Sequence, residues 1–97
     1  MFTNNQTETL ENPVESRVEN KRKLVLINDD VNTFDHVIDC LVHYCEHNNI
    51  QAEQCAFLTH YKGSCEIKTG SFEDLYPLKS ALQNEKLTVC ILSLIHI

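Results

Sequence analysis

The chain lacks three features that would place it in a familiar class: a Cys-x-x-Cys pair, a long apolar run and a basic patch. Its cysteines are odd in number and fall among apolar residues, which predicts small buried side chains in a reducing compartment. They are Cys40, Cys45, Cys55, Cys65 and Cys90. No apolar run approaches the roughly 18 residues of a membrane span. The first residues show neither the basic region nor the apolar region of a secretory signal. We therefore expect a cytoplasmic protein.

The net charge of -6 lies after residue 23, because four glutamates and four basic residues balance one another before that point. An acidic body without a basic patch repels nucleic acid and anionic membrane surfaces, so neither is an expected partner. A polar opening stretch leaves roughly 70 to 75 residues for a core, which is near the lower range for a lone domain. We expect one domain, monomeric, without a large catalytic cavity.

Residues 1–22 are rich in Asn, Thr and Glu and predict a disordered N-terminal arm, followed by a core domain over 23–92 and a tail over 93–97. The run at 23–27 is apolar on both faces, which predicts a strand in the middle of a sheet. Asn32 or Thr33 is then suited to cap a helix over 34–48. Its expected core-facing stripe comprises Phe34, Val37, Ile38, Leu41 and Cys45.

A second helix is expected over 51–62, ended by Gly63, with Cys55, Phe57, Leu58 and Tyr61 available for burial. Residues 65–69 alternate as a strand. A third helix starts after Ser71, is expected to kink or restart at Pro77, and runs to about Glu85. Residues 87–92 form the last strand. This order predicts an α+β fold: a small three-stranded antiparallel sheet with three helices on one face.

Asn28, Asp29 and Asp30 follow the first strand at a strand-to-helix junction, where small polar residues most often make turn and cap hydrogen bonds. Their side chains also offer more hydrogen-bond acceptors than donors, which favours a positively charged ligand. If the two helices form a hairpin, His60 lies near them, although it could equally be an ordinary surface histidine. Asn28, Asp29 and neutral His60 would together suit a protein α-amino group, which has three donors and one charge.

The run from Lys23 to Ile38, the turn at residues 60–63 and the closing 87–90 together resemble ClpS, the adaptor of the Clp protease. The resemblance implies that Asn28, Asp29 and His60 hold the α-amino group of a substrate's first residue. It implies that Asp30, Asn32, Phe34, Val37, Ala56 and Thr59 form the pocket and its gate. The implied substrates are proteins that begin with a bulky apolar residue such as Leu, Phe, Tyr or Trp.

The same resemblance implies delivery to the AAA+ unfoldase ClpA for degradation by ClpP, with the N-terminal arm needed for delivery. The implied contact with the N-domain of ClpA includes Ser71, Glu73, Tyr76 and Lys79. Ala56 is smaller and Phe34 larger than the family's usual residues at those positions, which bears on the preference among first residues. The third helix with Pro77 also departs from the family.

Other readings start from the same residues. The C-terminal domain of the bacterial ribosomal stalk protein is similar in expected fold, so a general interaction domain without amine specificity is the alternative. Cysteine-histidine catalysis would need a thiol beside His60, and Cys65 is expected on the core face of a strand, so no enzyme is predicted.

One helical stripe with metal-ligand spacing comprises His36, Cys40, His43 and His47. Tetrahedral sites usually draw ligands from more than one element, so we assign no metal or cofactor from the sequence.

Overall fold

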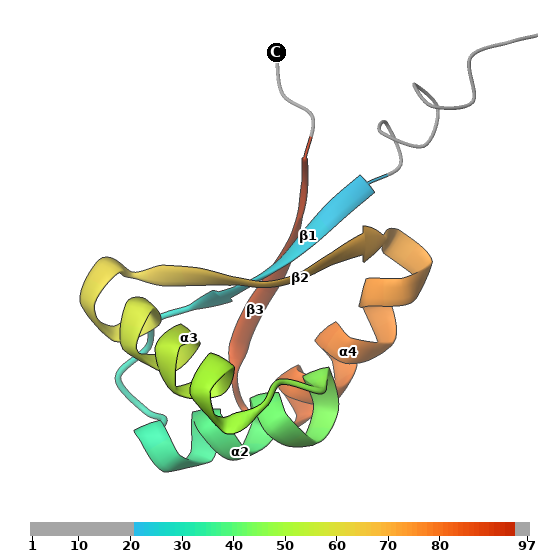
Figure 1. Cartoon of the computed structure of the whole chain (residues 1–97). Helices are drawn as coiled ribbons and strands as arrows, with labels where there is room; N and C mark the ends of the chain where they lie inside the picture. Colours follow the sequence, from blue (N-terminus) through green and yellow to red (C-terminus); the bar gives the residue numbers. More distant parts are fainter. Residues whose placement is uncertain (1–20, 95–97) are drawn as a thin grey trace, which may run out of the picture.

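The computed structural model describes residues 21–94, which form six elements in the order strand, helix, helix, strand, helix, strand. They are β1 (Lys21–Ile27), α2 (Phe34–Cys45), α3 (Asn49–Lys62), β2 (Ser64–Ser71), α4 (Phe72–Asn84) and β3 (Thr88–Ser93). The helices lie together on one side of the sheet (Figure 1). The predicted α+β class and element order are confirmed.

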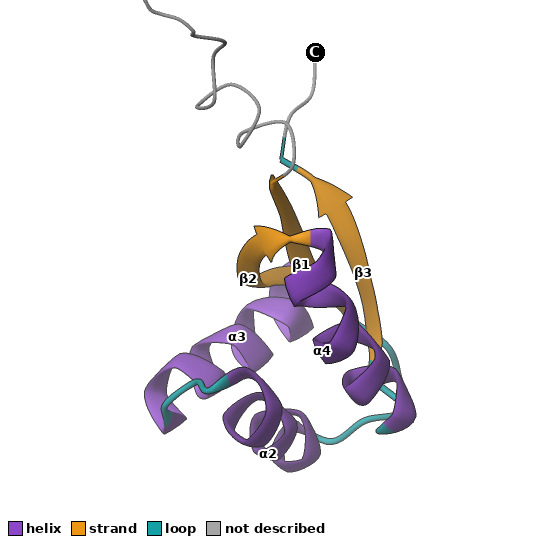
Figure 2. Ribbon diagram, turned by 90° about the vertical axis from the view of Figure 1, so that its right-hand side faces the viewer, coloured by secondary structure: helices purple, strands orange, loops and turns teal. Residues whose placement is uncertain are grey.

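The sheet has the order β2-β1-β3, and β1 pairs antiparallel with both neighbours (Figure 2). The central position predicted for the first strand is therefore confirmed. At its end, Ile27 pairs with Ser64 on one side and with Thr88 on the other. The loop that follows β1 thus emerges between the beginnings of the two outer strands, and that position determines what the loop can touch.

The core lies between the sheet and the three helices. Five leucines have at most 2% of their surface exposed, and the burial of each contributes about 1.5–3 kcal/mol to folding. They are Leu24, Leu26, Leu41, Leu75 and Leu82. Because β1, α2 and α4 each supply at least one of them, this cluster fixes the helices against the sheet and so positions the loop after β1.

The boundary between α2 and α3 differs from the prediction. The first helix ends at Cys45 rather than at residue 48, because Glu46 turns the chain in the left-handed conformation with φ of 61°. Asn48 belongs to the next helix instead: its side chain accepts from the Gln51 backbone N–H, while the Gln51 side chain accepts from the Asn48 backbone N–H. This capping box starts α3 at Asn49, two residues earlier than expected. Gly63 ends α3 as predicted, with φ of 97°.

Of the residues expected to be buried on α3, Cys55 is buried and the other three are not. Phe57, Leu58 and Tyr61 are exposed, whereas the buried side chains are small and recur at helical spacing. These are Ala52, Cys55, Ala56 and Thr59. Small side chains allow α3 to pack closely on its neighbours, so the burial follows the three-to-four residue period and not the size of the apolar side chain. Phe34, expected in the core stripe of α2, is also 41% exposed.

The helix does not restart at Pro77, one of the two outcomes expected there, because α4 continues from Phe72 to Asn84 with the proline inside it. Proline removes one helical N–H, whose partner would be the carbonyl of Glu73. Glu73 and Pro77 are both exposed, so this turn of the helix lies on the solvent side of α4. Leu75 and Leu82 are fully buried on either side of the proline and hold the helix against the core.

The chain ends need smaller corrections. Lys21 and Arg22, expected in the arm, belong to β1, and Ser93, expected in the tail, belongs to β3. The rest of the predicted arm and residues 95–97 of the tail lie outside the described residues. Within residues 21–94, each helix is too short or too polar to cross a bilayer. The five cysteines are all unpaired thiols.

Candidate functional site

The loop between β1 and α2 is organised by the carboxylate of Asp29. Its Oδ1 accepts from the backbone N–H groups of Val31, at 2.9 Å, and of Asn32, at 3.0 Å. The Asn32 side-chain amide donates to both oxygens, at 3.2 and 3.0 Å. This is the turn chemistry that the sequence left as an alternative, and most of the acceptor capacity of Asp29 is used within the loop.

Three further hydrogen bonds attach this loop to β3 and to the residues that precede β2 and β3. Thr88 donates its hydroxyl to Asp29 Oδ2 at 3.2 Å, and the Asn32 amide donates to the Lys86 carbonyl at 2.9 Å. On the opposite side, the Asn28 backbone N–H donates to the Gly63 carbonyl at 2.9 Å. The loop is therefore held at both flanks, which fixes the backbone at Asn28 and the carboxylate of Asp29.

Asp29 keeps its negative charge through this network. Its partial burial alone would raise the pKa of the carboxyl. The hydrogen bonds from the backbone of Val31 and Asn32, and those from the side chains of Asn32 and Thr88, outweigh burial and hold the pKa below 3.8. A fixed negative charge thus stands at the end of β1 at neutral pH.

His60 lies near the end of α3 and is exposed. Its ring stands at 88° to that of Phe34, the first residue of α2, with the ring centroids 5.4 Å apart. A second edge-to-face contact joins it to Tyr61 at 4.7 Å. These contacts orient the imidazole beside the start of α2, as the predicted helix hairpin required.

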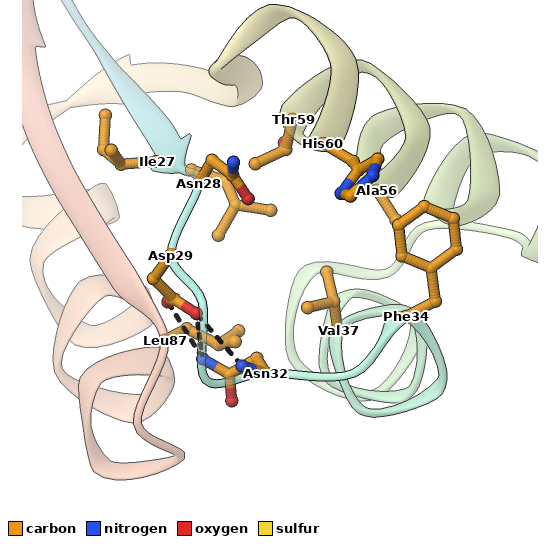
Figure 3. Close-up of a pocket in the computed structure, with 11 residues that line it drawn as sticks. Ile27, Asn28, Asp29, Asn32, Phe34, Val37, Ala56, Thr59, His60 and Leu87 are labelled. Atoms are coloured by element: carbon orange, nitrogen blue, oxygen red, sulfur yellow. Dashed lines mark hydrogen bonds between the residues drawn. The ribbon is translucent and has the colours of Figure 1, made fainter.

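A hollow of about 50 Å³ lies between the loop and the two helices. Figure 3 shows Asn28, Asp29 and Asn32 on the loop side, with Phe34 and His60 across from Asp29 and Asn32. Its lining joins polar atoms at the loop to apolar side chains from the sheet and helices. The complete lining is Leu26, Ile27, Asn28, Asp29, Asn32, Phe34, Val37, Ala56, Thr59, His60 and Leu87.

Eight of the nine residues predicted for the amine site and its pocket line this hollow, and the exception is Asp30. Asp30 is exposed and is not part of the lining. Three lining residues were missed: Leu26, Ile27 and Leu87. The first two adjoin the polar motif in sequence, which is a usable signal. Leu87 precedes β3 and reaches the hollow only because β3 pairs with β1.

The hollow offers binding atoms rather than reactive ones. Its lining contains no cysteine and no serine, and the hydroxyl of Thr59 already donates to the Cys55 carbonyl at 2.8 Å. Asn28 supplies an amide oxygen, His60 an imidazole nitrogen and Asp29 a charge. Such a set suits a small cation with several N–H donors.

The residues predicted to contact the unfoldase lie apart from the hollow, on α4 and its N-cap. They are Ser71, Glu73, Tyr76 and Lys79. Ser71 is the N-cap of that helix and accepts from the Asp74 backbone N–H at 3.1 Å. Tyr76 is half-exposed, with its ring 5.6 Å from that of Phe72 and the Lys79 ammonium 5.8 Å from its centroid. Glu73 is exposed beside them. This is an aromatic surface with charge of both signs.

Comparison with known proteins bears on the family and on the fold. The family model described as ATP-dependent Clp protease adaptor protein ClpS matches residues 17–89. The fold is similar to that of Agrobacterium tumefaciens ClpS2 bound to L-phenylalaninamide, with a TM-score of 0.70 and 18% sequence identity. That similarity covers 75% of this chain and 95% of the other. A search of curated proteins gives no match.

Proposed function

Because the chain belongs to the ClpS family of ATP-dependent Clp protease adaptor proteins, we propose that it binds other proteins by their first residue. The recognised features are a free α-amino group and a bulky apolar side chain. The bound protein is then handed to an AAA+ unfoldase of the ClpA type for degradation by ClpP. The observation that carries this proposal is that Asn28, Asp29 and His60 border one hollow with an apolar lining.

The α-amino group is held by acceptors of different kinds. Asn28 Oδ1 and a neutral His60 nitrogen each accept one N–H of the ammonium, at about 1.5–3 kcal/mol for a charge-assisted hydrogen bond. Asp29 acts chiefly through its charge, because its oxygens already accept from Val31, Asn32 and Thr88. Acetylation of the amine removes the positive charge and leaves one donor, so it abolishes this recognition.

The first side chain enters the apolar part of the hollow, between Val37, Ala56 and Leu87. Burial of a bulky side chain contributes about 1.5–3 kcal/mol. The hollow of about 50 Å³ is smaller than the roughly 150 Å³ of an engineered cavity that binds benzene, so the pocket opens to admit a ring. With the ordering costs included, affinity on the micromolar scale is expected.

The relative of known structure supports the choice of ligand. L-phenylalaninamide, to which Agrobacterium tumefaciens ClpS2 is bound, carries a free α-amino group and a benzyl side chain. Both features correspond to the two halves of the hollow in this chain. Nothing in this mechanism requires bond making or breaking, so the protein acts by binding and not as an enzyme.

The test is a panel of short peptides that differ only in the first residue, each with a free or an acetylated amine, measured by fluorescence anisotropy. Unmodified Leu, Phe, Tyr and Trp peptides bind, and their acetylated twins do not. Asn28→Ala and His60→Ala weaken binding at least about tenfold, a loss of roughly 1.4 kcal/mol. Asp30→Asn is the matched control, because Asp30 is exposed and outside the lining. Equal binding of free and acetylated peptides would instead indicate a general interaction domain.

The unfoldase contact is proposed at the aromatic surface of α4, formed by Phe72, Tyr76 and Lys79 with the nearby Glu73. Exposed aromatic rings beside charged groups are common at protein interfaces. Tyr76→Ala and Lys79→Glu are expected to weaken binding to the N-domain of a ClpA-type unfoldase while leaving peptide binding intact. Gln83→Ala, exposed on the same helix, is the control. Unchanged unfoldase binding in both variants would remove this surface from the proposal.

A further inference from the structure

The helical stripe predicted from His36, Cys40, His43 and His47 is incomplete in the structure. His47 lies beyond the end of α2 at Cys45, and its Nε2 lies 3.1 Å from the Ile67 carbonyl. His36 and Cys40 stay together, with His36 Nε2 3.7 Å from Cys40 Sγ. Glu85, the residue that caps the end of α4, joins them from the other side. Two elements distant in sequence thus converge on one place.

We infer that His36, Cys40 and Glu85 bind a divalent transition-metal ion, for which Zn²⁺ is the best match. Their ligand atoms all lie within 4.8 Å of one another. Zinc takes nitrogen, sulfur and carboxylate ligands at about 2.0–2.3 Å, and three protein ligands with an open fourth position form a common arrangement. His36 and Cys40 are four residues apart on one helix, a spacing that places two ligands on the same face.

The required adjustment is small. Tetrahedral bonds of about 2.0–2.3 Å place neighbouring ligand atoms roughly 3.3–3.8 Å apart. Side-chain rotations that move the ligand atoms of His36, Cys40 and Glu85 by about 1 Å therefore reach this arrangement. His36 Nε2 lies 2.9 Å from the Glu85 backbone carbonyl, to which it can only donate. Metal binding exchanges this one hydrogen bond for ligation, with the ring proton on Nδ1.

Neighbouring side chains support the cluster. Tyr44 donates to Glu85 Oε2 at 2.8 Å, which orients the carboxylate as the hydrogen-bond partners of metal ligands commonly do. Asp39 lines the same hollow and adds a second carboxylate beside the three proposed ligands. A metal ion would bind Cys40 as the thiolate and displace the thiol proton.

The remaining coordination position faces an open hollow on the surface. His43 and Asp39 line that hollow with the three proposed ligands, so either one or a water molecule is available as the fourth ligand. None of His36, Cys40 and Glu85 lines the hollow at the end of β1. The metal site is therefore separate from the proposed peptide site, and the two can be tested independently.

Zinc binding is measured on the full chain, purified without a histidine tag under reducing conditions, by competition with a chromophoric chelator. One Zn²⁺ binds per chain. Glu85→Gln keeps an acceptor for Tyr44 but removes the charged ligand, and it weakens binding at least about tenfold. His36→Gln does the same, whereas His47→Gln, the matched control from the same stripe, stays within about twofold of the parent. Co²⁺ gives a thiolate charge-transfer band that is lost in Cys40→Ser.

The absence of saturable zinc binding by the parent chain would overturn the inference. So would equal zinc affinity in Glu85→Gln and the parent, because ligation would then follow the helix stripe or other cysteines. Circular dichroism of each variant shows whether it remains folded. If Glu85→Gln is unfolded, Glu85→Ala replaces it in the comparison with the parent, because it also removes the carboxylate ligand.

Discussion

The Phe34 and His60 rings stand perpendicular to one another at 88°, with their centroids 5.4 Å apart. One ring begins α2 and the other lies near the end of α3, so their contact closes the rim of the hollow between the two helices. An aromatic pair of this geometry is worth about 0.5–1.5 kcal/mol. That energy is small enough for a ligand to displace the Phe34 ring, which is already 41% exposed.

Phe34→Ala is expected to reduce discrimination among first residues. Without the ring, the rim no longer resists the wider side chains, so the affinities of Leu, Phe and Trp peptides converge relative to the parent protein. The measurement is the ratio of Trp to Leu dissociation constants for parent and variant. Val31→Ala, a change at a loop residue that is 80% exposed, leaves the ratio unchanged. A ratio unaffected by Phe34→Ala would show that the gate is elsewhere.

His60→Gln is expected to weaken peptide binding less than His60→Ala, because the glutamine side chain keeps an acceptor for an N–H of the ammonium. The measurement is the dissociation constant of one free-amine Leu peptide for the parent and both variants. Equal losses in the two variants would show that His60 does not act as an acceptor for the amine.

Asp29→Asn is expected to destabilise the protein by about 1–3 kcal/mol at pH 6, because a charged acceptor of several loop hydrogen bonds is lost. The folded-state pKa of Asp29 lies below 3.8, despite the opposing effect of burial. The stabilisation by its charge is therefore complete above about pH 3.8 and disappears as the pH falls through the folded-state value. Urea unfolding at pH 6 and pH 3 measures the difference in the free energy of unfolding between parent and variant. This difference is smaller at pH 3.

The matched control is Asp30→Asn, which changes the adjacent, exposed carboxylate and is expected to alter the free energy of unfolding by less than about 0.5 kcal/mol. A parent-to-Asp29→Asn gap of equal size at both pH values would mean that the loss comes from geometry and not from the charge.

Much of the fold and the polar side of the site could be predicted because the determining signals are local. The apolar run before Asn28 identifies β1, and Gly63 identifies the end of α3 with its positive φ. Asn28 and Asp29 adjoin one of these elements and His60 the other. Their approach follows once the two helices form a hairpin, so short-range patterns sufficed.

The remainder depends on relationships that no local pattern contains. Leu87 lines the hollow because β3 pairs with the end of β1, and Glu85 meets His36 across 49 residues of chain. The exposure of Phe57 likewise depends on which face of α3 meets the sheet. Asp29 shows the same limit at close range. The sequence left open whether its oxygens make turn hydrogen bonds or face a ligand, and the loop conformation decides this by directing two backbone N–H groups at Oδ1.

Pro77→Ala is expected to raise the free energy of unfolding by about 1–3 kcal/mol. The substitution restores an N–H that can donate to the Glu73 carbonyl, and proline is about 3 kcal/mol less favourable than alanine inside a helix. Part of this gain is offset, because alanine leaves the unfolded chain more freedom. Urea unfolding of parent and variant gives the difference, with Gln83→Ala as a control for an exposed change on the same helix. An unchanged or lower stability would show that α4 is adapted to the proline, with the Glu73 carbonyl fully satisfied by water.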